Sequence, residues 1–416
     1  MKGRSLAGWL EYIEQQHAQT IALGLERVGE VFSRLQIGIS CPILTVGGTN
    51  GKGSACAMLE AVLRSAGYRA GLYTSPHLLR YNERVRIGGR EADDAALCEA
   101  FAAVESARGN VPLTYFEFGT LAAFFLFSKE NLQAAILEVG LGGRLDAVNL
   151  LEADCAVLTS VGIDHVEFLG DSREAIGREK AGIFRSGRPA VVADPQPPDS
   201  VLEEIRRVGA RPILIGRDFG YRAQGTQWSY WGQAGKRSGL AHPALRGAMQ
   251  LRNASAAFAA LDSLRARLPI AMQDVRRALA EVTLPGRFQV LPGRPQVVLD
   301  VAHNPEAAAV LAANLADSGF APETIAVFGM LRDKDIAGVV RAVAPRITRW
   351  HLATLPGPRG ADAARLMDVI AAEKIQSPAI KHETVAAALA AARNEAGESD
   401  KIVVFGSFLT VAGAYG

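Results

Sequence analysis

Ten short runs of apolar, largely β-branched residues alternate along the chain with longer stretches rich in alanine and leucine. Each run is continuous rather than alternating between apolar and polar residues. Strands of a parallel sheet covered by helices on both faces have this pattern, because both sides of such a strand are buried. The sequence therefore predicts a doubly wound α/β architecture. The predicted strands are 43–46, 70–74, 134–139, 155–161, 190–193, 213–215, 297–301, 325–328, 350–353 and 402–405.

Two segments interrupt this rhythm. Residues 217–243 carry Tyr221, Trp228, Tyr230 and Trp231 among glycine, glutamine and serine, which predicts antiparallel hairpins at an edge of the sheet. Two Pro-Gly turns follow close together, at Pro285-Gly286 and Pro292-Gly293, and mark a domain boundary. We therefore expect a larger α/β domain over residues 1–286 and a smaller Rossmann-like α/β domain over residues 287–416.

Composition excludes several classes of protein. The 45 Lys and Arg residues nearly balance the 43 Asp and Glu residues, so we expect no nucleic-acid partner and no anionic membrane surface as partner. The four cysteines form no CxxC pair, which argues against a disulfide framework or a zinc knuckle. No apolar run reaches the roughly 20 residues of a membrane helix, and the N-terminus lacks the pattern of a signal peptide. We expect a cytoplasmic protein.

The strongest local signal is a glycine-rich loop between a predicted strand and a predicted helix. It reads Thr45-Val46-Gly47-Gly48-Thr49-Asn50-Gly51-Lys52-Gly53-Ser54. Glycines let successive backbone N–H groups converge on phosphate oxygens, and the helix N-terminus adds partial positive charge. Lys52 supplies a point charge for the β- and γ-phosphates. The sequence predicts a phosphate loop here.

The loop departs from the common GxxxxGK[ST] pattern, because Val46 holds the first glycine position and Gly53 follows the lysine. The hydroxyl that binds Mg²⁺ in the common loop must then come from Ser54 or from another segment. Ser75, Glu138 and His165 all lie at or just after the ends of predicted strands, where open α/β sheets bind ligands. A hydroxyl, a carboxylate and an imidazole suit Mg²⁺ or Mn²⁺ held partly through phosphates and water.

Each of these three residues has a simpler explanation. Ser75 precedes Pro76 and can begin a turn, Glu138 can form a structural ion pair, and His165 can be a buried core histidine whose hydrogen bonds are satisfied. The shared position at strand ends favours the metal site without excluding these alternatives.

Several motifs together resemble the folylpolyglutamate synthase/dihydrofolate synthase family. The resemblance runs in order from about residue 20 to about residue 410. The Mur peptidoglycan ligases share the architecture but usually carry a further N-terminal domain, for which we expect little room before Gly47. The motifs are Gly48-Thr49-Asn50-Gly51-Lys52-Gly53-Ser54, Thr74-Ser75-Pro76-His77-Leu78, Leu137-Glu138-Val139-Gly140-Leu141-Gly142-Gly143-Arg144-Leu145-Asp146-Ala147, Asp164-His165, Glu179-Lys180-Ala181-Gly182-Ile183-Phe184, Pro285-Gly286-Arg287-Phe288, Asp300-Val301-Ala302-His303-Asn304-Pro305 and Gly406-Ser407-Phe408.

This resemblance implies a Mur-ligase-like fold, with a P-loop ATPase domain, a smaller C-terminal domain and ATP between them. It assigns a role to three sets of residues. The implied ATP ligands are Gly51, Lys52, Gly53, Ser54, Asn253, Arg287 and Asp300. The implied metal ligands are Ser75, Glu138 and His165. The implied pterin site comprises Ala22, Leu23, Gly24, Thr114, Tyr115, Phe116, Glu117, Leu145, Asp146 and Ala147.

The resemblance also singles out Lys180, because the matching lysine of the family can be carbamylated. A carbamate turns a cation into an anion and can help to hold a second metal ion. The alternative is an ordinary helix lysine. Similarly, without the resemblance, Tyr115 and Phe116 are a core aromatic pair at the start of a helix. The residues expected to act in catalysis are Lys52, His165 and Lys180.

The activity that the resemblance implies is ATP-dependent amide formation through an acyl phosphate, with one or two Mg²⁺ ions. The expected substrates are L-glutamate and either dihydropteroate or a folate. Two alternatives stay open: a Mur-type or other amino-acid ligase, and a phosphate-loop switch protein that hydrolyses nucleotide to change partners. We expect a monomer.

Overall fold

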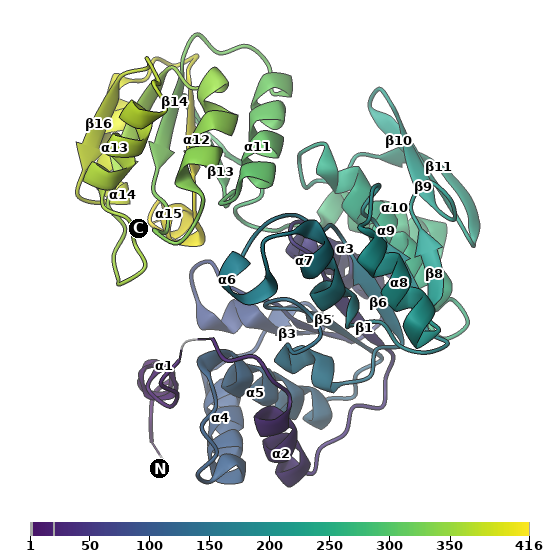
Figure 1. The fold of residues 1–416 in the computed structure, drawn as a ribbon. Helices are drawn as coiled ribbons and strands as arrows, with labels where there is room; N and C mark the ends of the chain where they lie inside the picture. The colour runs from purple at the N-terminus through teal and green to yellow at the C-terminus, as the bar shows by residue number, and fades with distance from the viewer. Residues whose placement is uncertain (1–2, 20, 416) are drawn as a thin grey trace. The chain divides into compact units, whose positions relative to one another are not determined.

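The computed structural model describes residues 3–19 and 21–415, and the chain forms two compact units (Figure 1). Unit 1 comprises Met1–Ala244 and Leu251–Val282, and unit 2 comprises Leu245–Gln250 and Thr283–Gly416. Each unit is an α/β body built around its own sheet, as the continuous apolar runs predict.

The sheet of unit 1 has eight strands in the order β4-β3-β2-β5-β1-β6-β7-β8. Its six longer strands are parallel, and the two short strands β3 and β4 continue it as antiparallel neighbours of β2. The strands β1, β2, β5, β6 and β7 are buried along their whole length. The bounds are β1 Ile43–Gly47, β2 Ala70–Tyr73, β3 Val85–Ile87, β4 Arg90–Glu91, β5 Ala134–Glu138, β6 Cys155–Leu158, β7 Pro189–Val192 and β8 Arg211–Leu214.

Four helices of unit 1, α1, α4, α5 and α7, begin after a polar residue whose side chain accepts a hydrogen bond from a free N–H group of the first turn. Thr114 and Glu117 form a reciprocal capping box at the start of α5, and Ser172 caps α7. The helices and short 3₁₀ turns are α1 Leu6–Glu14, α2 Glu26–Leu35, α3 Lys52–Ser65, η1 Tyr81–Arg84, α4 Asp94–Arg108, α5 Tyr115–Lys129, η2 Ala147–Leu150, α6 Val166–Leu169, α7 Arg173–Ala181, α8 Asp199–Val208, α9 Met249–Ser263 and α10 Met272–Glu281.

Residues 217–243 form antiparallel hairpins, as predicted, but not at an edge of the large sheet. They make a separate three-stranded sheet of β9 (Gly220–Gln224), β10 (Gln227–Gly232) and β11 (Gly235–Ala241). Trp228 stacks on Phe258 of α9, with ring centroids 5.8 Å apart. The Tyr230 hydroxyl donates to the buried Asp262 carboxylate at 2.7 Å. The aromatic residues that mark this segment thus seat the small sheet on α9.

Unit 2 contains a six-stranded sheet in the order β12-β13-β17-β14-β15-β16, coloured green to yellow in Figure 1. All its strand pairs are parallel except β12–β13. The strands are β12 Gln289–Leu291, β13 Gln296–Asp300, β14 Thr324–Phe328, β15 Arg349–Ala353, β16 Ala379–His382 and β17 Lys401–Phe405.

Apolar residues of α11, α12 and α13 pack on one face of this sheet, around Phe328, Trp350 and Phe405. The helix α14 packs on β14 and β15. The helices and the short turn are α11 Pro305–Asp317, α12 Ile336–Val343, η3 Ala344–Arg346, α13 Ala363–Ala372, α14 Val385–Glu395 and α15 Phe408–Ala412.

All ten predicted strands exist, within a few residues of their predicted ends. The four additional strands β3, β4, β12 and β16 are half-buried or exposed in part, so they lack the continuous apolar signal. Throughout the part of the chain that the structure describes, no helix is both long enough and apolar enough to cross a membrane.

Candidate functional site

The glycine-rich loop lies between β1 and α3, as predicted, and close packing against the chain after β6 fixes its shape. Gly48 has φ +143°, and a Cβ atom there would lie 2.0 Å from Thr159 Oγ1. Only glycine fits this position. The Thr159 hydroxyl donates to the Asn50 carbonyl at 2.7 Å, and the Asn50 amide donates to Ser160 Oγ at 3.0 Å. The loop is therefore held by side chains before any ligand binds.

The predicted nucleotide residues of unit 1 lie together at the start of α3. Gly51 caps the helix in a left-handed conformation, and a Cβ atom there would lie 2.7 Å from Asn253 Oδ1. Asn253, from α9, is thus beside the loop although it is about 200 residues away in sequence. Lys52 begins α3, Gly53 follows it, and Ser54 is buried in the first turn. An anion bound here would be stabilised by the partial positive charge of the helix N-terminus and by the Lys52 ammonium group.

Two lysine side chains converge on the carbonyl oxygen of Gly48. Lys52 Nζ donates to it at 2.9 Å and to the Thr49 carbonyl at 3.3 Å. Lys180 Nζ, from α7, donates to the same Gly48 oxygen at 3.1 Å. Lys180 is only 5% exposed, so it is not a solvated surface lysine.

Burial lowers the pKa of Lys180 to about 7, because the charged ammonium loses its hydration. The nearby Lys52 charge lowers the pKa further, whereas Asp164 and Asp146 oppose the shift. A substantial fraction of the Lys180 side chain is therefore the neutral amine near pH 7, which is the nucleophilic form.

The three predicted metal ligands lie at the carboxyl end of the sheet, after β2, at the end of β5 and after β6. The strands β2 and β5 are neighbours, and β1 lies between β5 and β6. Glu138 is the last residue of β5, and its Oε2 atom accepts a hydrogen bond from the Ser75 amide at 3.2 Å. His165 follows β6 in a left-handed conformation, and its backbone amide donates to Asp164 Oδ1 at 2.8 Å. Its side chain is 32% exposed, so the core-histidine interpretation is wrong.

Among the described residues, no group of three or more His, Cys, Asp and Glu side chains forms a complete metal cage. The donors at this edge are one carboxylate, one hydroxyl and one imidazole. Mg²⁺ is typically bound by one or two carboxylates and completed by substrate phosphates and water. The donor set therefore fits an ion that binds together with a nucleotide and does not fit an all-protein metal site.

The predicted pterin segments, which are far apart in sequence, are joined by hydrogen bonds. The Gly24 amide donates to the Leu145 carbonyl at 3.3 Å. Arg27 Nη2 donates both to the Ala22 carbonyl at 3.0 Å and to Glu117 Oε1 at 2.8 Å. Leu23 is half-buried, and Ala147 is buried in η2. These contacts make one region from the three segments.

Phe116 and Asp146 meet at Gly140 within this region. A Cβ atom at Gly140 would lie 2.6 Å from the Phe116 ring and 3.2 Å from Asp146 Oδ2. Asp146 accepts hydrogen bonds from the amides of Leu141 and Val148, at 2.8 and 3.0 Å. Burial nevertheless raises its pKa to about 6, since the ionised carboxylate is taken out of water. Phe116 is half-buried and is not sealed in the core.

In unit 2 the predicted residues Arg287 and Asp300 also lie together. Asp300 ends β13, and its two oxygens accept the amides of Phe288 and Ala302 at 2.8 Å each. Burial raises the pKa of Asp300, and Arg287 partly offsets the shift. The Arg287 guanidinium lies 5.1 Å from the ring centroid of Phe408. The carboxyl end of this second sheet thus carries a polar cluster of its own.

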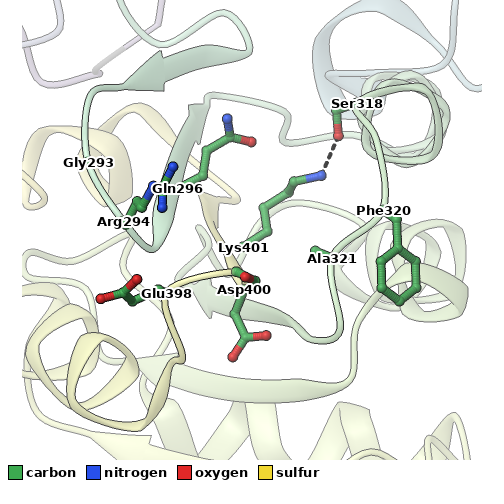
Figure 2. A pocket seen from close by; sticks show the side chains of 10 residues that line it. Gly293, Arg294, Gln296, Ser318, Phe320, Ala321, Glu398, Asp400 and Lys401 are labelled. Atoms are coloured by element: carbon green, nitrogen blue, oxygen red, sulfur yellow. Dashed lines mark hydrogen bonds between the residues drawn. The ribbon is translucent and has the colours of Figure 1, made fainter.

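A cavity of about 280 Å³ lies at the opposite end of the same sheet, where β13 and β17 begin (Figure 2). Lys401, the first residue of β17, donates to Ser318 Oγ at 2.5 Å beside Gln296, the first residue of β13. The cavity contains none of the predicted site residues, and therefore lies outside the candidate site.

Sequence reasoning missed several residues that build the site. Thr159 and Ser160 hold the loop, but short polar residues after a strand give no distinctive signal. Arg84 is buried at the end of η1, and its Nε atom donates to Nδ1 of His77 at 2.8 Å. In the sequence, the nearby charged residues Glu83 and Arg86 make it look like part of a solvated turn.

Comparisons with known proteins agree with this geometry. The Mur ligase middle domain profile matches residues 46–261, and the Mur ligase glutamate ligase domain profile matches residues 286–408. The dihydrofolate synthase/folylpolyglutamate synthase of Escherichia coli K12 is 44% identical over 408 residues, which cover 98% of this chain and 94% of that protein. The chain belongs to the dihydrofolate synthase/folylpolyglutamate synthase family.

Solved structures extend the likeness to the whole fold. Escherichia coli FolC in complex with DHPP and ADP is 44% identical, with a TM-score of 0.93 over 99% of this chain and 96% of that chain. A bifunctional folylpolyglutamate synthase/dihydrofolate synthase with Mn, AMPPNP and L-glutamate bound is also 44% identical, with a TM-score of 0.90 over 98% of this chain and 97% of that chain. The predicted Mur-ligase-like fold and the predicted ligase class are confirmed.

The buried Lys180 gives the folded chain a characteristic pH dependence. Its folded pKa of about 7 lies below the model-compound value of 10.5, so between these pH values the unfolded chain binds more protons than the folded chain. Stability must therefore rise with pH across this window. We expect Lys180→Met to be stabilised relative to the parent protein at pH 7, and this advantage to shrink by pH 10.

Thermal unfolding in carbonate-free buffer at several pH values measures this difference. Lys236→Met, at an exposed lysine of the small sheet, is the matched control and should show no such trend. A Lys180→Met advantage that stays constant from pH 7 to pH 10 would contradict the assignment.

Proposed function

We propose that the chain joins L-glutamate to 7,8-dihydropteroate and to tetrahydrofolates in an ATP-dependent reaction. The observation that carries this proposal is the sheet edge at which the phosphate loop, Lys52, Lys180 and Glu138 lie next to the region around Phe116 and Asp146. That edge offers cationic and N–H groups for phosphate beside an aromatic and carboxylate surface for a fused ring. The same combination is not expected of a nucleotide switch.

The chemistry needs ATP because an amine cannot displace oxide from a carboxylate. An oxygen of the acceptor carboxylate attacks the γ-phosphorus of ATP, the bond to the β-phosphate oxygen breaks, and an acyl phosphate and ADP form. The amino group of glutamate then attacks the acyl carbon, loses a proton, and phosphate leaves with the former carboxylate oxygen. Lys52 and the N–H groups of the loop stabilise the charge on the transferred phosphoryl group.

Ser75, Glu138 and His165 would hold a divalent ion, which supplies charge neutralisation at the phosphates when it is bound. One solved relative supports a divalent ion that binds together with a nucleotide, since it contains Mn and AMPPNP. For the nucleotide itself we propose Gly51, Lys52, Gly53, Ser54, Asn253, Arg287 and Asp300.

The acceptor ring is assigned to the region that joins residues 22–24, 114–117 and 145–147. The faces of Tyr115 and Phe116 can stack on a fused ring, and Asp146 can accept a hydrogen bond from ring N–H groups. The pKa of about 6 leaves Asp146 mainly ionised near neutral pH, so it acts there as an acceptor. A monomeric state and a cytoplasmic location stay predictions.

Release of ADP by the purified protein, with MgATP and L-glutamate, tests the function. We expect turnover with 7,8-dihydropteroate and with a tetrahydrofolate, and little turnover without an acceptor. Turnover with the tetrahydrofolate alone would remove the dihydrofolate synthase half of the proposal. Equal rates with and without acceptors would favour a nucleotide switch, and turnover only with other carboxylates would favour another Mur-type ligase.

Lys180 is proposed to react with CO₂ to form a carbamate. The amine nitrogen attacks the carbon of CO₂ and loses one proton, so a cation is replaced by an anion. The lowered pKa supports this step, because only the neutral amine reacts. The carbamate would then balance the charge of Lys52 and of a second metal ion.

Carbon-13 NMR of protein equilibrated with ¹³C-bicarbonate tests the carbamate directly. We expect a carbamate signal in the parent protein and in Lys236→Ala, and none in Lys180→Ala. Lys180→Ala should also lose most of its activity and recover part of it with added short carboxylates, which replace the missing anion. A fully active Lys180→Ala protein would overturn the proposed role.

A further inference from the structure

The cavity at the end of the unit 2 sheet where β13 and β17 begin contains a buried lysine (Figure 2). Lys401 is only 4% exposed. Its Nζ atom donates to Ser318 Oγ at 2.5 Å and to the Gly319 carbonyl at 3.3 Å. Both acceptors are neutral, and an ammonium group has three N–H groups to donate. These contacts therefore use two of the three N–H groups and bring no negative charge to Lys401.

Lys401 differs in its surroundings from the other buried cations in the part of the chain that the structure describes. Arg108 is paired with Glu105 at 2.6 Å, whereas Lys180 and Arg84 belong to the candidate site of unit 1. Lys401 forms no ion pair with any described residue. Burial lowers its pKa, because the charged ammonium loses its hydration. A buried charge without a counter-ion is costly, so an anion that enters the cavity would be stabilised.

Two further polar groups of the cavity wall are available to a ligand. Within the described chain, neither the Gln296 amide nor the Arg294 guanidinium forms a hydrogen bond or an ion pair. Gln296 and Lys401 are register partners in the parallel β13–β17 pair, so their side chains extend from the same face of the sheet. One carboxylate can therefore accept hydrogen bonds from both side chains.

The acidic residues of the cavity limit the charge of the ligand. Glu398 and Asp400 line the cavity beside its two cationic residues, so the charges of the wall cancel. Asp400 points away from the Lys401 ammonium in Figure 2, and its oxygens accept the amides of Glu323 and Gly397 at 3.0 and 2.7 Å. A monoanion can balance the Lys401 charge, whereas a dianion such as phosphate would bring excess negative charge to the two carboxylates.

The size of the cavity and an exposed aromatic ring indicate the body of the ligand. Pockets for drug-sized ligands measure roughly 300–1,000 Å³, so a cavity of about 280 Å³ fits a smaller molecule. Phe320, which also lines the cavity, is 94% exposed, and the next most exposed large apolar residue of the described chain, Leu79, is 51% exposed. A flat apolar group that covers the Phe320 ring would remove this surface from water.

We propose that this cavity binds a small aromatic monocarboxylate. The carboxylate accepts hydrogen bonds from Lys401 and Gln296, and the ring packs against Phe320. None of these residues belongs to the sites proposed above for ATP, the metal ion or the acceptor. The inference therefore goes beyond the proposed function and does not depend on it.

Calorimetric titration of the purified protein with benzoate, and with its neutral analogue benzamide, tests the site. A charge-assisted hydrogen bond corresponds to roughly 10- to 100-fold in affinity, so we expect the parent protein to prefer benzoate by that factor. Lys401→Met should lose this preference, while its affinity for benzamide stays similar. Lys381→Met, at an exposed lysine of β16, is the matched control and should keep the preference.

Two further probes test the rest of the assignment. Acetate has the carboxylate but not the ring, and inorganic phosphate has more charge, so we expect both to bind more weakly than benzoate. Phosphate that binds more tightly than benzoate would overturn the assignment of a monocarboxylate. Acetate that binds as tightly as benzoate would overturn the role of the aromatic ring.

A second variant decides if Lys401→Met does not fold. Gln296→Leu removes the neutral amide and keeps the lysine, so the affinity for benzoate should fall several-fold. Benzoate binding that is unchanged in a folded Lys401→Met or Gln296→Leu protein would place the ligand elsewhere and overturn the proposal. A parent protein that does not bind benzoate would overturn it as well.

Discussion

The carbonyl oxygen of Gly48 accepts hydrogen bonds from two lysines, and this contact organises the whole sheet edge. Lys52 reaches it from the first turn of α3 at 2.9 Å, and Lys180 reaches it from α7 at 3.1 Å. Two charged ammonium groups on one oxygen repel each other, and the burial of Lys180 adds the free-energy cost of removing its charge from water. These effects lower the pKa of Lys180 to about 7, so part of the Lys180 side chain is the neutral amine and is not repelled by Lys52. A phosphate anion, or a carbamate on Lys180, would also lower this electrostatic cost.

Glycine at position 48 makes this arrangement possible. With φ +143° and Thr159 Oγ1 2.0 Å from the place of a Cβ atom, no other residue lets the loop approach the chain after β6 so closely. Thr159 and Ser160 then hold the Asn50 backbone, so the loop, the end of β6 and α7 form one packed group. The phosphate-binding groups are thus oriented by the protein itself, which lowers the entropy cost of ordering them on binding.

The sequence predicts the parts of the fold whose physical cause is local. A strand that is buried on both faces must be apolar throughout, and the ten strands with this pattern were all identified. The strands β3, β4, β12 and β16 are short and partly exposed, and each carries polar or charged residues, so their sequences do not differ from those of loops. The small sheet β9–β11 was recognised as hairpins, but its seat on α9 depends on Trp228, Phe258 and Asp262, which only the tertiary structure brings together.

The same distinction applies to the site. The phosphate loop and the strand-end residues were found because their chemistry is tied to one motif or one position in a strand. The contact of Lys180 with Gly48, and the burial of Arg84 between Tyr81 and Tyr115, join residues from different elements and have no signature in a single sequence. The resemblance to a known family named Lys180 in advance, whereas Arg84 emerged from the structure alone.

We propose that the carboxyl end of the unit 1 sheet activates a carboxylate by phosphoryl transfer. The most direct measurement uses 7,8-dihydropteroate labelled with ¹⁸O in its carboxylate, with MgATP and L-glutamate, and follows the label by mass spectrometry. We expect one ¹⁸O atom in inorganic phosphate for each amide bond formed, and ADP as the nucleotide product. Unlabelled phosphate, or label that appears in AMP, would contradict it.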